Sequence, residues 1–234
     1  AWHGAGYCVA PFLAGPVREA LLAGLAGLVH RVTAEVCDEP ATPFPLDQYH
    51  RRCRDDACHY RIVSRLQALS PLENLPVDYR LVDDCVSVAL GTAVSCNVPG
   101  REAAGRFFIR IVRPGRTTDN NPPHRDVWLP RLRDAINLYV PLAGSNARSS
   151  LSLLPGSHLW PESDILRTPA GASIGGLSYT VPAVLGSRHG LAMTRPPVAD
   201  GQMLLFSPYL VHGGAVNLNE DLARMSLEMR FWRA

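Results

Sequence analysis

The chain has 234 residues, of which 47% are hydrophobic and 19% are charged, and its formal net charge is +2 at pH 7. These values are typical of an ordinary soluble globular protein, and the small charge gives no reason to expect nucleic acid or a charged membrane surface as a partner. All 23 basic residues are arginine, which excludes lysine chemistry such as a Schiff-base nucleophile or a P-loop. We therefore expect small molecules as partners.

In chain order, the first hundred residues carry mainly helical patterns. Residues 6–12 form a short predicted strand, after which Pro16 occupies the first turn of a predicted helix. The apolar residues of this helix recur at the spacing of one buried face, and they are Val17, Leu21, Leu25, Leu28 and Val32. Two further helices are predicted over about 58–69 and 78–90, and Gly91 is the natural end of the second.

The pattern changes after Gly105, where short β-rich runs alternate with clusters of Pro, Gly, Asn and Asp. These runs are 107–113, 135–142, 151–154, 202–209 and 225–232. They predict a mainly β fold: a double-stranded β-helix (an antiparallel, cupin-like jelly roll) with the N-terminal helices packed on one sheet. We expect one domain over 1–234, with a helical portion of about 1–104 and a jelly-roll core of about 105–234. A long connection at 159–200 either closes over an active site or is disordered.

The six cysteines follow no regular spacing, and the chain is large enough to fold without disulfides, so reduced thiols in a cytoplasm are expected. Cys53, Cys58 and His59 could belong to a zinc site, but their C-x4-C-H spacing lacks a second pair of ligands. No basic leader precedes an apolar run, and residues 16–32 are interrupted by Gly and too short to span a bilayer. The sequence therefore predicts a cytoplasmic protein without a membrane partner.

Chemistry is concentrated in His124 and Asp126, which stand two residues apart, and in the distant His212. In an extended strand, residues two apart project to the same face, so His124 and Asp126 can bind one ion while Arg125 points away. Two imidazoles and one carboxylate form the facial triad that suits Fe(II) and leaves coordination positions open. We predict that these three side chains are both the metal ligands and the catalytic centre.

Five motifs, in this order and spacing, resemble the phytanoyl-CoA dioxygenase family of Fe(II)- and 2-oxoglutarate-dependent oxygenases. They are His124-Arg-Asp126, INLYVPL at 136–142, LPGSH at 154–158, FSPYLVH at 206–212 and Arg224-Met-Ser226. The opening GYCVAPFL at 6–13 also resembles the first strand and helix of that family. The resemblance covers nearly the whole chain, and it implies Fe(II) as the metal with 2-oxoglutarate and O2 as cosubstrates.

The resemblance implies that 2-oxoglutarate binds iron through its 1-carboxylate and 2-keto oxygen, so its distal carboxylate points into the barrel. Arg224 offers a planar fork for that carboxylate, and Ser226, on the same strand face, can donate a further hydrogen bond. Arg110 and Asn137 are additional candidates for cosubstrate binding. The usual Gly before the LPGSH strand is replaced here by two serines, which alters a turn without touching the metal.

Two aromatic residues are candidates for substrate binding. Strand alternation places Trp128 in the pocket near the iron, and Tyr209 is the second candidate. His158, at the end of a Pro-Gly-Ser-His turn, is expected to be structural, because three protein ligands already satisfy this type of site. Several arginines near the motifs could attract an anionic group, although solvated side chains are the default interpretation; they are Arg125, Arg131, Arg133, Arg148, Arg188 and Arg195.

The implied activity is hydroxylation of an unactivated C–H bond of a small molecule, with release of succinate and CO2. The presence of Asp126 favours oxygen transfer over halogenation, because related halogenases have a small residue there that makes room for halide. Two alternatives stay open. One is a jelly-roll protein that binds a metal or ligand without catalysis, and the other is a cupin-type metal-dependent hydrolase or isomerase, since a His/Asp/His site also accepts Zn or Mn.

Overall fold

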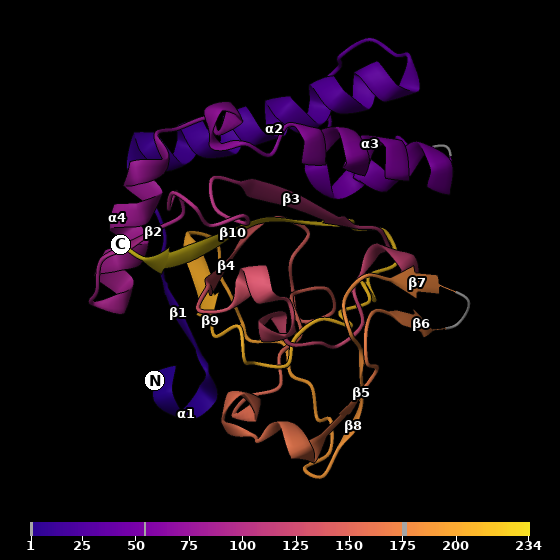
Figure 1. The fold of residues 1–234 in the computed structure, drawn as a ribbon. Coiled ribbons are helices and arrows are strands. Elements are labelled where there is room, and N and C mark those ends of the chain that lie inside the picture. The colour runs from indigo at the N-terminus through magenta and orange to yellow at the C-terminus, as the bar shows by residue number, and fades with distance from the viewer. Residues whose placement is uncertain (1, 54, 175–176) are drawn as a thin grey trace.

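The computed structural model describes residues 2–53, 55–174 and 177–234. Its two longest helices lie on one side of a large sheet, a third helix lies along an edge near the C-terminus, and short strands and loops lie on the other side; the short first helix lies apart from these three (Figure 1). The helices are α1 (Trp2–Ala5), α2 (Gly15–Cys37), α3 (Asp56–Ala68) and α4 (Tyr79–Leu90). The strands are β1 (Tyr7–Pro11), β2 (Val94–Ser95), β3 (Phe107–Val112), β4 (Ile136–Ala143), β5 (Ile165–Arg167), β6 (Ala172–Ile174), β7 (Leu177–Tyr179), β8 (Val184–Ser187), β9 (Gln202–Phe206) and β10 (Arg224–Arg233).

The main sheet has six strands, and all of their pairings are antiparallel. The order is β1, β9, β4, β10 and β2, and β3 also pairs with β10. Strand β10 therefore lies between β3 and β4, although these strands are far apart in sequence. This crossing connectivity, together with the helices on one face, confirms the predicted double-stranded β-helix fold.

The layer that faces the main sheet consists of shorter pieces. Strand β5 pairs with β8, and β6 pairs with β7. Isolated bridges join His124 to His212 and join Leu153 to Thr194 and His212. The predicted strand over 151–154 is wrong, because Leu153 forms single bridges rather than a ladder. The expected long connection at 159–200 contains β5 to β8, and only its residues 175–176 lie outside the described chain.

Alternation along β10 separates the core from the inner face of the sheet. Its odd-numbered side chains are buried in the same apolar cluster as α2, and they are Met225, Leu227, Met229 and Phe231. The even-numbered side chains point to the opposite face, and they are Arg224, Ser226, Glu228 and Arg230. The apolar positions of this strand therefore pack away from the polar ones.

Helix α2 is longer than the sequence suggested, and this corrects the expectation of a segment too short to span a bilayer. With 23 residues, most of them apolar, it is long and apolar enough to cross a membrane by length and composition. However, its predicted face is buried in the core at Leu21, Leu25 and Leu28. The apolar character of α2 therefore has an explanation in its packing against the sheet. Of the expected face, Val17 is only half-buried.

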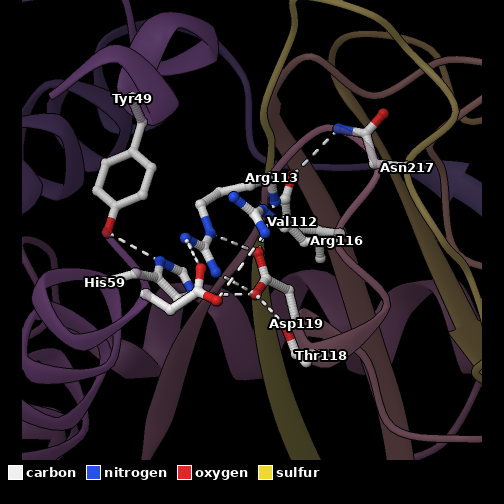
Figure 2. A network of polar contacts seen from close by, with 9 residues as sticks. Tyr49, His59, Val112, Arg113, Arg116, Thr118, Asp119 and Asn217 are labelled. Atoms are coloured by element: carbon white, nitrogen blue, oxygen red, sulfur yellow. Dashed lines mark hydrogen bonds and ion pairs between the residues drawn. The ribbon is translucent and has the colours of Figure 1, made fainter. Parts of the chain in front are cut away.

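A buried polar network joins the helical layer to the segment that leads to His124 (Figure 2). Arg113, which follows β3, donates from Nε and Nη2 to the Asp119 carboxylate over 2.9 and 2.8 Å. His59 Nε2 lies 3.4 Å from Asp119 Oδ1, and the Tyr49 hydroxyl lies 3.1 Å from His59 Nδ1. A bidentate arginine–carboxylate pair has a fixed geometry. The network therefore anchors the start of the metal-ligand segment to η1 (Leu46–Arg51) and α3.

The network makes stability depend on pH through His59. This residue is only 1% exposed, and burial lowers its pKa to about 4. In the unfolded chain the same imidazole titrates near pH 6.5, so the unfolded state takes up a proton first, and stability falls as the pH drops from about 6.5 towards 4. Between pH 7 and pH 5, we expect the wild-type protein to lose about 2 kcal/mol more unfolding free energy than His59→Gln. Urea unfolding measures this, and equal losses would contradict it.

Candidate metal centre and cosubstrate site

Three buried side chains, His124, Asp126 and His212, converge at a cavity on the inner side of the main sheet. Their ligand atoms all lie within 4.8 Å of one another. Asp126 Oδ1 is 3.4 Å from Nε2 of His124 and 3.9 Å from Nε2 of His212. In the described part of the chain, no other group of at least three His, Cys, Asp or Glu side chains meets in this way. The predicted convergence of the triad is therefore confirmed.

The backbone brings the two imidazoles together. The His124 amide donates to the His212 carbonyl over 2.8 Å, and the His212 amide donates back over 3.0 Å. Nδ1 of His124 lies 2.8 Å from the Pro122 carbonyl oxygen, and Nδ1 of His212 lies 2.9 Å from that of Leu210. Because a carbonyl only accepts, each Nδ1 carries the proton, and each Nε2 has a lone pair for a metal. Backbone carbonyls of the chain therefore fix the orientation of both imidazole rings.

Arg125 shows how the chain turns between the two ligands. Its φ of −112° and ψ of 133° are extended, as predicted, and a 3-10 helix then begins at Asp126. Its guanidinium points away from the metal site, donates to the carbonyls of Ser157 and Trp160, and pairs with Glu162. Arg125 is only 2% exposed. It is therefore neither solvated nor a site for an external anion, and it ties the ligand segment to the LPGSH turn.

Gly213 lets the chain that follows His212 approach the chain that precedes His124 closely. Its φ is +102°, and a Cβ at this position would lie 2.8 Å from the Pro122 carbonyl oxygen and 3.1 Å from Nδ1 of His124. Glycine is the residue that fits such a conformation and such a contact. Gly213 was not among the predicted site residues, although the Gly-Gly pair directly after His212 was an available signal.

The cysteine-rich segment does not form a second metal site among the described residues. Cys58 Sγ lies 3.2 Å from Cys37 Sγ, whereas His59 belongs to the network of Figure 2. Burial raises the pKa of the Cys53 thiol to about 12. The thiol, imidazole and carboxylate atoms of this segment do not converge as those of the triad do. The interpretation of these cysteines as thiols outside a zinc site is therefore favoured.

The cavity beside the triad has a volume of about 470 Å³ and reaches Arg224. A second hollow of about 360 Å³ adjoins it. The two share six lining residues, which are Gln67, Phe108, Arg110, Asn120, Asn121 and Thr180. The metal ligands therefore open onto a space that continues between β3, α3 and the segment around β7.

Arg224 is 1% exposed and carries a positive charge inside this cavity. Its Nη1 lies 3.5 Å from Ser226 Oγ, and its guanidinium carbon lies 5.7 Å from the centre of the Tyr139 ring. Its Nε has no hydrogen-bond partner, and no carboxylate of the described residues lies within ion-pair distance of it. A buried cation without a partner is unfavourable. The geometry is therefore that of a site for an anion.

The other two predicted cosubstrate residues also line the cavity. Arg110 is 3.3 Å from Glu228, so it already has a carboxylate partner, in contrast to Arg224. Burial by itself would raise the pKa of Glu228, but the guanidiniums of Arg110 and Arg224 hold it below its usual range. Asn137 lies opposite Arg230 in the β4–β10 pairing, and its Nδ2 has no partner among the described residues. A cosubstrate role for Arg110 and Asn137 stays a prediction.

The structure places Trp128 and Tyr209 outside the described lining of the cavity. Trp128 ends a 3-10 helix instead of continuing a strand, so strand alternation does not apply, and the Arg167 guanidinium lies over its ring at 4.7 Å. Tyr209 is 44% exposed. Glu228 and Arg230 do line the cavity but were not predicted, although they continue the alternation that begins at Arg224.

His158 lies apart from the triad, in the turn after the LPGSH motif. Its Nε2 is 3.1 Å from the His3 carbonyl oxygen. A Cβ on Gly6 would lie 2.5 Å from its Nδ1, so the ring packs directly against the start of the chain. These contacts are those of a structural residue, which is the predicted role of His158.

Known proteins match the chain in family and in fold. A family model described as Phytanoyl-CoA dioxygenase (PhyH) matches residues 2–226. AviO1 from Streptomyces viridochromogenes Tue57 is 20% identical over 99% of this chain and 91% of its own, with a TM-score of 0.55. The non-heme alpha ketoglutarate dependent epimerase SnoN from nogalamycin biosynthesis is 12% identical over 100% and 80%, with a TM-score of 0.50. At these identities the structural likeness establishes the fold alone, and no curated protein matches the sequence.

Proposed function

Because the chain belongs to the phytanoyl-CoA dioxygenase family, whose cofactor and cosubstrate are Fe(II) and 2-oxoglutarate, we propose that it hydroxylates an unactivated C–H bond of a small molecule. Succinate and CO2 would be the coproducts. The observation that carries this proposal is that the buried triad and the unpaired Arg224 line the same cavity. The triad would supply the metal ligands, and Arg224 would supply the partner for a carboxylate.

The protonation states of the triad support an iron centre. Burial lowers the pKa of His212 to about 4, so this imidazole is neutral at physiological pH. Burial would raise the pKa of Asp126, but Arg230 and the two imidazoles hold it well below its usual range. Metal ligands must be deprotonated, and two imidazoles with one carboxylate suit Fe(II). Iron held here together with 2-oxoglutarate supplies the oxidising power of activated O2.

The residues at the far end of the cavity support binding of 2-oxoglutarate. Arg224 would pair with the distal carboxylate, and Ser226, which is fully buried and whose hydroxyl donates to Glu228 over 3.4 Å, would turn that hydroxyl to donate a further hydrogen bond to the carboxylate. Tyr139 is fully buried beside the guanidinium and keeps water away from this pair. In such a water-poor environment an ion pair is stronger than at the surface. When its distal carboxylate is anchored in this way, the 1-carboxylate and the 2-keto oxygen of 2-oxoglutarate would face the metal.

The adjoining hollow supports a substrate that is larger than the cosubstrate. The hollow is lined by hydroxyl, amide and aromatic side chains, including Thr118, Ser178 and Tyr179, and by the aliphatic side chains of Val63, Ile109 and Ile111. Its two charged groups already have partners, since Asp119 pairs with Arg113 and Arg110 pairs with Glu228. We therefore expect an uncharged, hydrogen-bonding portion of the substrate in this part of the space.

Anaerobic titration with Fe(II) and 2-oxoglutarate tests the proposal. We expect a visible charge-transfer absorption that appears only when both are present, followed by succinate release when O2 and a suitable metabolite are added. The absence of the absorption would contradict the oxygenase assignment. Chelation without succinate, for every metabolite screened, would favour a non-catalytic binding protein, and metal-dependent turnover under strict anaerobiosis would favour a hydrolase or isomerase. Products need separation as well as mass analysis, because SnoN is described as an epimerase.

A further inference from the structure

A second arginine of β10 reaches the metal centre. Arg230 lies on the same strand face as Arg224, and its side chain lines the cavity while remaining only 22% exposed. Its Nη2 is 3.6 Å from Asp126 Oδ2. In the described chain, no other arginine lies within ion-pair distance of this carboxylate. The proposed oxygenase site does not by itself require this contact.

The two oxygens of Asp126 face different partners. Oδ1 lies towards Nε2 of His124 and of His212, where the metal would sit. Oδ2 is buried, lacks a hydrogen-bond partner in the described chain and faces Arg230. A separation of 3.6 Å is too long for a hydrogen bond but short enough for strong attraction between opposite charges away from bulk water. The attraction between Oδ2 and Arg230 therefore turns Oδ1 towards the metal position.

Other nearby arginines cannot replace Arg230. Arg125 is turned away towards Ser157 and Trp160, and Arg110 pairs with Glu228. The guanidinium of Arg230 is held in place by Phe108, whose ring centre lies 5.7 Å from its central carbon. Such a cation–π contact restricts a long side chain without neutralising its charge.

We propose that Arg230 is a positioning residue for the iron ligand Asp126, and this inference rests on the proposed role of the triad as a metal centre. The guanidinium holds Oδ2, and this orients Oδ1 before any metal arrives. Partners of this kind orient ligands in many metal sites, and their loss typically weakens metal binding by about 10- to 100-fold. Arg230 would thus contribute to iron affinity without touching the ion.

A purely electrostatic effect of Arg230 predicts the opposite change in metal affinity. A positive group near a cation site repels the cation, so its removal should strengthen metal binding. If Arg230 positions Asp126, its removal should weaken metal binding instead. The direction of the change in affinity therefore separates a positioning role from a merely electrostatic one.

Titration of metal-free protein with Co(II), followed by visible absorption in the absence of 2-oxoglutarate, measures this direction without any turnover. We expect Arg230→Met to bind Co(II) about tenfold more weakly than wild type, and Arg230→Lys to recover part of the loss because it keeps a positive charge near Oδ2. The matched control is Arg106→Met, which removes one positive charge from the same cavity. Arg106 donates to Ser70 Oγ over 3.0 Å and does not contact Asp126, so this variant should bind Co(II) as tightly as wild type or more tightly.

Unchanged or tighter Co(II) binding by Arg230→Met would overturn the proposal, and so would an equal weakening in Arg106→Met. Circular dichroism of the metal-free proteins verifies that each variant is folded. If Arg230→Met does not fold, Phe108→Leu provides the second variant, because it frees the guanidinium while keeping its charge, and it should weaken Co(II) binding to a smaller extent. Failure of the wild-type protein to bind Co(II) would instead refute the metal centre and with it the proposed function.

Discussion

Replacement of Arg224 by methionine is expected to weaken binding of 2-oxoglutarate by about 100-fold, because truncation of one partner in a buried charge pair costs about 2–5 kcal/mol. The same change is expected to stabilise the protein in the absence of 2-oxoglutarate. Arg224 is buried without a carboxylate partner in the described chain, and an apolar side chain of similar length removes this unfavourable charge. Arg224→Met should therefore lower the affinity for 2-oxoglutarate and raise the stability of the ligand-free protein.

Equilibrium dialysis with Mn(II)-loaded protein measures cosubstrate binding, and thermal unfolding without 2-oxoglutarate measures stability. Arg233→Met is the matched control, because Arg233 is an exposed residue at the end of the same strand. It should change neither quantity. Retention of 2-oxoglutarate affinity in Arg224→Met, together with a lower midpoint of unfolding, would show that Arg224 is a structural residue of the core.

Replacement of Asp126 by alanine is expected to abolish iron-dependent formation of succinate. Loss of a residue that only orients a ligand typically costs about 10- to 100-fold, so loss of the ligand itself should cost more than about 100-fold. Asp126 supplies the one negative charge of the triad, and both imidazoles direct Nε2 towards its Oδ1. Without it, the site keeps two neutral ligands and binds Fe(II) poorly.

Succinate is best measured in chloride-free buffer, because a halide could occupy the space that the shortened side chain leaves. Asp200→Ala serves as the control, since Asp200 has a side chain that is 85% exposed and pairs only with Arg18 among the described residues. It should leave turnover unchanged. Wild-type rates in Asp126→Ala would contradict the assignment of this carboxylate as a ligand.

The sequence predicted the metal ligands because local geometry carried most of the information. The extended conformation at Arg125 directs His124 and Asp126 to one side, and the order of motifs indicated His212 as the third ligand. The same reasoning failed two residues later at Trp128. The chain leaves the extended conformation at Asp126, and a 3-10 turn redirects the indole towards Arg167. Alternation is reliable only for as long as the strand continues.

The partners of the inner face of β10 could not be predicted from sequence alone. The spacing of Arg224, Glu228 and Arg230 indicates a common face, but it does not indicate that Glu228 meets Arg110 or that Arg230 meets Asp126. Those contacts depend on how β3 and the ligand segment are placed against β10, which is a matter of long-range register. For the same reason the apolar run at 151–154 suggested a strand, although tertiary packing leaves Leu153 with isolated bridges.

The central place of β10 also bears on how such an enzyme can diversify. One strand, clamped between β3 and β4, carries both the arginine proposed to anchor the cosubstrate and the arginine beside the iron ligand. By contrast, Thr180 and Val181, which also line the cavity, come from the short connection between β7 and β8, outside the main sheet. Changes in that connection are therefore expected to alter the choice of substrate while they leave the iron ligands and the arginines of β10 in place.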